Sequence, residues 1–257
     1  MKQSQAKKRD NAMTNKILMG LIALVLGLLF LEILIVHSKN EQQKNASNQV
    51  QTVRIMANGD LLYHDALYMS ALQADGSYDF TENFTYVKPW LKQADLVLGD
   101  FEGTINPDYP LSGYPLFNAP QSVTAAIKDA GYDVMDLAHN HILDSGLEGA
   151  FTTADAFKKV GIDPIGVYEK PVRDKAPLLI KNVNGIKVAI LSYAYGYNGL
   201  ESNLTDKEVA DHLSNLDEKR MKAEIQRAEK EADITVIMPQ MGVEYRLEPT
   251  DEQVALY

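Results

Sequence analysis

One apolar run constrains what the beginning of this chain can fold into. Residues 17–36 are twenty consecutive positions with a single charge, Glu32, and a helix of that length crosses the roughly 30 Å hydrocarbon core of a bilayer. The residues before the run carry five basic side chains and one acid. Because Lys and Arg stay on the cytoplasmic side, the sequence predicts a cytoplasmic tail over 1–16, a transmembrane signal-anchor helix over 17–37 and an extracellular main domain at the cell membrane.

A cleaved signal peptide is the alternative interpretation of this run. Its apolar core would be about 7–15 residues long and would end in small residues before the cleavage site. The present core is longer, and the segment 33–37 (ILIVH) offers no small-residue site, which favours an uncleaved anchor. The next residues, 38–51, are polar and predict a short flexible stalk.

The amino-acid composition restricts which kinds of functional site the chain can carry. The chain has no cysteine, which excludes thiolate metal sites, cysteine nucleophiles and disulfides. The net charge is −10, and because residues 1–39 contribute six basic and two acidic side chains, the rest carries −14. A domain this acidic lacks a general polyanion-binding surface, so nucleic acid is not an expected partner.

Residues 52–257 show the alternation typical of an α/β domain. Apolar segments flanked by Gly alternate with helical patterns, which predicts a mostly parallel sheet covered on both faces. Asn184-Gly185 separates two further apolar runs and predicts an antiparallel hairpin. The predicted strands are 53–58, 95–101, 133–138, 162–167, 178–183, 186–193 and 233–239, and the predicted helices are 84–93, 122–130, 147–160, 216–232 and one that begins at 250.

Four polar groups follow predicted strands, at the positions where α/β sheets place functional residues. Carboxylate, imidazole and amide groups suit hard or borderline divalent ions, and two such ions about 4 Å apart can activate water for attack on a phosphoryl group. The groups are Asp60 with His64, Asp100 with Glu102, His139-Asn140-His141 with Asp144, and Gln240 with Glu244. The third is the strongest, since it places two imidazoles, an amide and a carboxylate in six residues.

Several of these candidates have an equally simple structural interpretation. Asp60 could cap a turn, His64 could be a partly exposed histidine, and Asp100 could be an ordinary loop acid. Gln240 and Glu244 are weak candidates when taken individually.

The third group is harder to explain by structure alone. His139 could orient a neighbour, and Asp144 could cap the helix that follows it. The adjacent pair Asn140 and His141 favours a site, and Glu102 is a better ligand candidate than the acid two residues before it.

These motifs resemble the bacterial capsule-synthesis family CapA, the poly-γ-glutamate capsule proteins. The matching segments are 55–60 (IMANGD), 94–103 (ADLVLGDFEG), 136–146 (DLAHNHILDSG), 242–245 (GVEY) and 249–253 (PTDEQ). The resemblance implies a branch of the calcineurin-like metallophosphatases, with a four-layer α/β/β/α sandwich and a two-metal site for Mn, Zn or Fe. It would assign Asp60, Glu102, Asn140 and His141 to the metal site, with Asn140 and His141 also catalytic.

Two departures from the family pattern are visible. Gln240-Met241-Gly242 stands where many relatives have His-Trp-Gly, and an amide oxygen is a weaker ligand than an imidazole. The family's later Gly-His-Pro-His segment is not found before Tyr257. Since the last predicted helix has no stop signal, we expect a chain truncated at its C-terminus, with an impaired or non-catalytic version as the alternative.

The resemblance implies a membrane-anchored protein of capsule biosynthesis, acting in the synthesis or export of a poly-γ-glutamate-type envelope polymer. One hypothesis is a metal-dependent, phosphoesterase-like hydrolase or transferase. The alternative is a non-catalytic factor that binds the polymer or assembles a capsule-export complex, and a third option is a degenerate domain without activity. The expected partners are the cell membrane, other capsule-synthesis membrane proteins and an anionic polymer, and bound metal would discriminate between the hypotheses.

Overall fold

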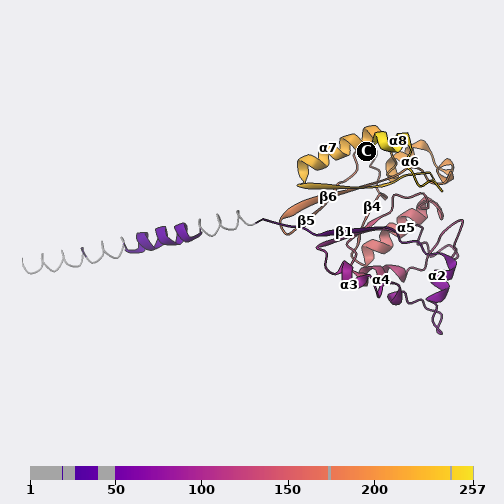
Figure 1. Ribbon diagram of the computed structural model, residues 1–257, viewed down its shortest axis with the longest axis horizontal. Helices are drawn as coiled ribbons and strands as arrows, with labels where there is room; N and C mark the ends of the chain where they lie inside the picture. The colour runs from indigo at the N-terminus through magenta and orange to yellow at the C-terminus, as the bar shows by residue number, and fades with distance from the viewer. Residues whose placement is uncertain (1–18, 20–26, 40–49, 173–174, 244, 257) are drawn as a thin grey trace, which may run out of the picture. The chain divides into compact units, whose positions relative to one another are not determined.

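The computed structural model describes residues 19, 27–39, 50–172, 175–243 and 245–256 (Figure 1). Residues 1–51 and 52–257 form separate units. Residues 27–39 are helical and exposed, but no helix within the described ranges is long and apolar enough to cross a membrane. Residues 17–18 and 20–26 of the predicted anchor, and 40–49 of the predicted stalk, lie outside those ranges, so both segments stay predictions.

The first sheet of residues 52–257 is fully parallel. Its strands follow chain order and are β1 (Ile55–Asp60), β2 (Leu96–Asp100), β3 (Val134–Asp136) and β4 (Asp163–Ile165). Both β2 and β3 are buried along their whole length, because both faces of this sheet are covered. The helices between these strands are α2 (Asp65–Ser70), η1 (Thr81–Phe84), α3 (Lys88–Leu91), α4 (Val123–Ala130) and α5 (Gly146–Lys159).

The second sheet has the order β5 (Leu179–Val183), β6 (Ile186–Ala194), β7 (Ile234–Gln240). The predicted hairpin is confirmed: β5 and β6 are antiparallel, and the turn residues Asn184 and Gly185 have φ angles of 54° and 85°. β7 joins β6 in parallel. The helices after β6 are η2 (Leu200–Asn203), α6 (Asp206–His212), α7 (Glu218–Glu231) and, beyond β7, α8 (Asp251–Leu256).

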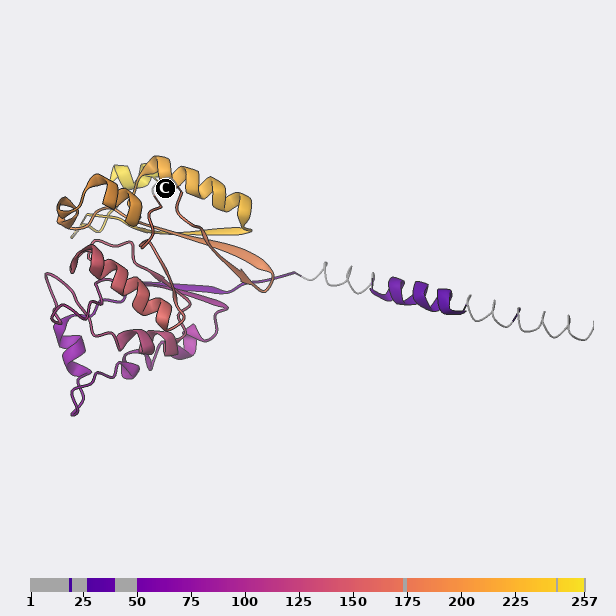
Figure 2. The same cartoon turned by 180° about the vertical axis from the view of Figure 1, so that it is seen from behind.

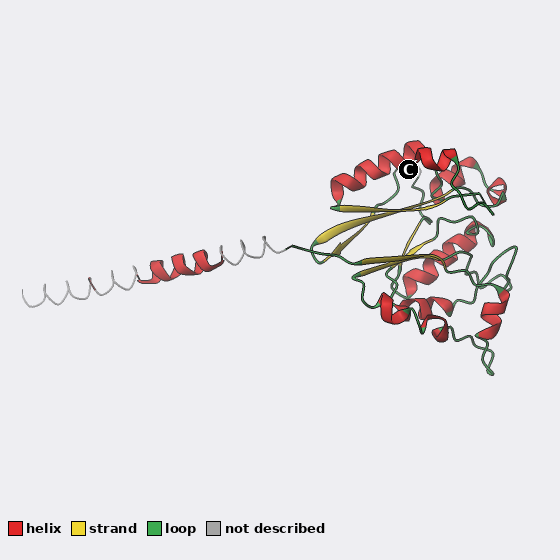
Figure 3. Ribbon diagram, viewed as in Figure 1, coloured by secondary structure: helices red, strands yellow, loops and turns green. Residues whose placement is uncertain are grey.

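The elements of residues 52–257 stack in four layers, with helices outside each of two facing sheets (Figures 1, 2 and 3). Leu98, Val134 and Ile190 belong to the apolar core that both sheets share. On the outer face of the second sheet, Met221 and Ala228 of α7 pack with residues of β6. The predicted α/β class with a parallel sheet is therefore confirmed.

The helix predicted over 84–93 is wrong in its extent. The segment is divided into η1 and α3, and Pro89 lies in the first turn of α3. Proline has no backbone N–H, so a helix running through it would lose a hydrogen bond, and a helix that starts beside it loses none. Helix α6 was not predicted, although Thr205 and Glu208 form a capping box at its start.

Candidate functional site

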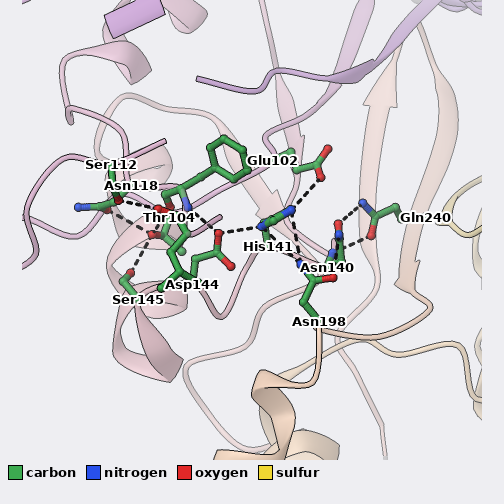
Figure 4. Close-up of polar contacts among 12 residues, drawn as sticks. Glu102, Thr104, Ser112, Asn118, Asn140, His141, Asp144, Ser145, Asn198 and Gln240 are labelled. Carbon is green, nitrogen blue, oxygen red and sulfur yellow. Dashed lines mark hydrogen bonds and ion pairs between the residues drawn. The ribbon is translucent and has the colours of Figure 1, made fainter. Parts of the chain in front are cut away.

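The carboxyl ends of both sheets meet at one polar cavity. Asp60 ends β1, Glu102 follows β2, Asn140 follows β3, and Gln240 ends β7 on the second sheet. All four line a cavity of about 580 Å³. His141 does not line it; with Asp144 and Asn198 it lines a second cavity of about 530 Å³. In Figure 4, the Glu102 carboxyl is directed at the His141 ring, and Gln240 is paired with the neighbouring Asn140. The topology thus gathers side chains from strands that are distant in sequence.

The His141 ring is oriented by Asp144. Its Nδ1 lies 2.8 Å from Asp144 Oδ2, and the backbone N–H of Phe117 donates to the same oxygen at 2.6 Å (Figure 4). Because a carboxylate oxygen only accepts, the proton of the neutral ring is on Nδ1. The other nitrogen, Nε2, is then the basic one, and it faces Glu102 Oε1 at 3.8 Å.

Asp60 and Glu102 form a pair of neighbouring carboxyl groups. Burial, followed by a hydrogen bond with Asp60 and the negative charge of Asp60, raises the pKa of Glu102 to about 8, while His141 opposes the shift. A divalent cation between the two carboxyl groups would offset the negative charge that Asp60 places beside Glu102, so this pair fits a metal site in its donor chemistry.

The Asn140 side chain is held on two sides by amides. The Asn140 backbone N–H donates to Gln240 Oε1 at 2.7 Å, and Gln240 Nε2 donates to Asn140 Oδ1 at 2.8 Å. Asn140 Nδ2 donates to Asn198 Oδ1 at 3.1 Å. Asn198 follows β6 and has a left-handed φ of 54°, a conformation that asparagine tolerates better than most residues.

A second group of ionisable residues lies buried behind the cavity. Burial, and then the charges of Asp136 and Asp60, raise the pKa of Asp100 to about 9, and burial raises the pKa of Asp136 to about 7. Burial, followed by the nearby His141, lowers the pKa of His139 to about 3, which keeps its ring neutral. Asp100 and His139 line neither of the two cavities at the site, so they contribute electrostatics and packing there.

The buried acids predict how stability depends on pH when divalent ions are removed. The ordinary aspartate pKa is 3.8, and the folded values of Asp100 and Asp136 lie above it, so the folded state holds protons that the unfolded state has lost. Their contribution to stability is therefore present below about pH 4 and is lost as the pH rises through about 7 and 9. Urea unfolding in a chelator, from about pH 5 to pH 9, should show the wild type losing stability relative to Asp136→Asn. A wild type that keeps or gains stability relative to Asp136→Asn as the pH rises would contradict this.

Of the other predicted site residues, His64 lines neither cavity, Asp144 lies at the site beside His141, and Glu244 is not described. His64 is exposed at the start of α2, where its ring accepts from the Asp65 backbone N–H and pairs with the Asp65 carboxylate. Asp144 does not cap α5, whose N-cap is Ser145; its carboxylate is committed to His141 instead. Glu244 lies outside the described residues.

Asn198 is a site residue that the sequence did not point to. The signal was present, because Asn198-Gly199 follows the apolar run of β6, and Asn-Gly marks a turn. A turn at a strand end has no visible connection with the motif around Asn140, which lies 58 positions earlier.

The donor set at the cavity is rich in oxygen. Among the described residues, no three His, Cys, Asp or Glu side chains are arranged to hold one metal ion together. The donors that line the cavity are the carboxylates of Asp60 and Glu102 and the amides of Asn140 and Gln240, and the His141 imidazole lies 3.8 Å from Glu102. Their chemistry fits a divalent ion only if an amide oxygen completes the set.

Comparison with known proteins agrees with the motifs. Residues 54–257 match the family described as bacterial capsule synthesis protein PGA_cap. The chain is similar to the capsule biosynthesis protein CapA of Bacillus anthracis, with 31% identity over 182 residues, which is 67% of this chain and 43% of that protein. It is also similar to the PGA biosynthesis protein CapA of Bacillus subtilis strain 168, with 27% identity over 173 residues, 66% of this chain and 45% of that protein.

The chain thus spans less than half the length of these two relatives. Among solved structures, it is similar to a Staphylococcus aureus protein described as a putative 5′-nucleotidase in complex with α-ketoglutarate, with a TM-score of 0.48 and 15% identity over 76% of this chain and 39% of that one. The family match extends over nearly all of the unit that carries the cavity. This chain therefore belongs to the bacterial capsule synthesis protein family PGA_cap.

Proposed function

We propose that this chain is a membrane-anchored, extracellular protein of capsule biosynthesis whose cavity works as a metal-dependent hydrolase or transferase on a poly-γ-glutamate-type envelope polymer or its precursor. The observation that carries the proposal is the His141–Asp144 pair, whose basic Nε2 faces the Glu102 carboxyl at the meeting of the strand ends. Similarity to two proteins named for capsule or PGA biosynthesis supports the biological context.

The roles follow from the geometry of these side chains. Asp60, Glu102 and the Asn140 amide oxygen would hold a divalent ion such as Mn, Zn or Fe, which supplies Lewis-acid polarisation of a phosphoryl or similar oxygen. His141 Nε2 accepts or returns a proton at the reacting oxygen, because Asp144 holds the other nitrogen in its protonated form. Asn140 would act through its amide oxygen, because its Nδ2 donates to Asn198 Oδ1 at 3.1 Å. The resemblance to calcineurin-like metallophosphatases is part of this proposal.

A non-catalytic assembly factor is the second candidate. It is favoured by one finding: among the described residues, no three His, Cys, Asp or Glu side chains form a ready metal cluster. In this version the domain would join other capsule-synthesis membrane proteins and guide an anionic polymer. Because the chain after residue 39 carries −14, contact with such a polymer would need bridging cations or a local basic patch.

Metal content separates the two candidates. The full chain, loaded with Mn²⁺ and dialysed, should retain the metal and hydrolyse bis-p-nitrophenyl phosphate. Glu102→Gln keeps the size of the side chain but removes a charged ligand, so bound metal and turnover should both fall by about tenfold or more. Asp65→Asn is the matched control, since Asp65 is an exposed acid in α2 that does not line the cavity. A wild-type chain that retains no Mn²⁺, Zn²⁺ or Fe yet supports capsule formation would leave only the assembly factor.

A further inference from the structure

We propose that Gln240 and Asn198 are positioning residues that set the direction of the Asn140 carboxamide, and that Gln240 is not itself a metal ligand. The role of Asn140 toward a cation rests on the function proposed above, whereas the orientation of its amide does not. The proposal concerns Gln240, the last residue of β7.

One backbone group, the Asn140 N–H, fixes which end of the Gln240 and Asn140 side-chain amides is the oxygen. A peptide N–H can only donate, and the Asn140 N–H lies 2.7 Å from one end of the Gln240 amide, which must therefore be the oxygen. The other end of Gln240 is then the NH₂ group, 2.8 Å from Asn140. That atom of Asn140 must be its oxygen, because two donors would repel. No choice of amide orientation is left for either residue.

The same reasoning extends to His141. With Asn140 Oδ1 turned to Gln240, Asn140 Nδ2 donates to Asn198 Oδ1 at 3.1 Å. The Asn198 NH₂ group then faces the His141 ring, 3.4 Å from Nε2 and 3.5 Å from Nδ1 (Figure 4). Because these two distances are nearly equal, the amide lies against the face of the ring and leaves the in-plane lone pair of Nε2 open, while Nδ1 carries the proton shared with Asp144. Three amides thus point in one direction, from β7 to the imidazole.

Gln240 ends β7 and Asn198 follows β6, so both amides belong to the second sheet and its loops. Asn140 lies on the loop after β3 of the first sheet. The backbone of Gln240 is held in register opposite Ala194, and its carbonyl accepts from the Tyr195 N–H at 3.0 Å. Both ends of the Gln240 amide are used by Asn140. Gln240 therefore acts as a two-point clamp between the sheets, and Asn140 keeps one lone pair of its oxygen for a further partner.

Substitution of Gln240 by glutamate is the sharpest test, because it keeps the shape and the acceptor for the Asn140 N–H but removes the donor to Asn140 Oδ1. We expect the Asn140 amide to turn over, so that its NH₂ group faces the new carboxylate and its oxygen no longer serves the cavity. Titration calorimetry on the full chain should show Mn²⁺ affinity falling about 10- to 100-fold, the usual effect of losing an outer partner of a ligand. Gln253→Glu is the matched control: it adds the same charge to the same cavity and keeps the acceptor for the Thr250 N–H.

Hydrogen exchange at Asn140 gives a readout that needs no metal. In ¹⁵N-asparagine-labelled protein, protection of the Asn140 backbone N–H should persist in Gln240→Glu and drop about tenfold in Gln240→Leu, with thermal unfolding used to confirm that both variants are folded. Unchanged protection in folded Gln240→Leu overturns the clamp, whether or not metal binds. A Mn²⁺ affinity of Gln240→Glu equal to or above that of Gln253→Glu would assign Gln240 as a ligand and overturn the positioning role. Failure of the wild type to bind Mn²⁺, Zn²⁺ or Fe, with the exchange pattern as expected, would contradict the enzymatic function and leave the clamp supported.

Discussion

Replacement of His141 by alanine is expected to lower the turnover of a phosphodiester by about 10²- to 10⁴-fold, the range contributed by a positioned general acid or base. The reason is the geometry around its ring: Asp144 accepts a hydrogen bond from Nδ1–H, and Nε2 faces Glu102 at 3.8 Å. No other imidazole lines either of the two cavities at the site among the described residues. Steady-state kinetics on the metal-loaded full chain measures the effect.

Two further variants make the His141 result specific. His64→Ala should leave turnover close to that of the wild type, because His64 is exposed at the start of α2 and contacts Asp65. Asp144→Asn keeps the shape of the side chain but removes the charge that stabilises a protonated His141 ring, so an intermediate loss is expected. If His141→Ala and His64→Ala lost equal activity, or if neither lost any, His141 would have no role in proton transfer.

Substitution of Gly166 by alanine is expected to destabilise the fold by roughly 2–5 kcal/mol, from left-handed backbone strain and overpacking together. Gly166 follows β4 with a φ of +91°, and a Cβ there would lie 2.5 Å from the backbone nitrogen of Ala138 and 2.7 Å from its Cβ. Backbone atoms cannot move away as a flexible side chain does. Because Ala138 precedes the segment that carries Asn140 and His141, turnover should fall together with stability.

A second substitution, at Gly161, separates the cost of left-handed backbone strain from the cost of overpacking. Gly161 has a φ of +77°, and a Cβ added there would meet no atom within 4 Å, so Gly161→Ala should cost only the backbone strain, about 1–2 kcal/mol. Urea unfolding of both variants against the wild type measures the difference. Equal losses for the two substitutions would show that the approach of Gly166 to Ala138 adds nothing.

Most of the secondary structure was accessible from local pattern. The strands and the Asn184-Gly185 hairpin were predicted within a few residues, because alternating apolar segments and turn residues are governed by neighbours along the chain. The exceptions were short elements, such as α2 and the divided segment 81–91, where one residue like Pro89 decides the outcome. The four polar groups could be nominated together because strand ends in a parallel sheet lie at one edge, whereas the family resemblance implied the choice of Asp60, Glu102, Asn140 and His141 among them.

The partners of those residues depended on packing in three dimensions. Nothing near Gln240 in the chain indicates that it clamps a residue 100 positions away, and nothing near Asp144 distinguishes a helix cap from a partner of His141. The complete burial of His139, next to the cavity-lining Asn140, likewise follows from how the loop after β3 packs within the domain. Periodicity and turn chemistry act over a few residues, so they specify elements and their order. Hydrogen-bond partners and pKa shifts arise where distant elements meet, and they exist only after the two sheets have packed.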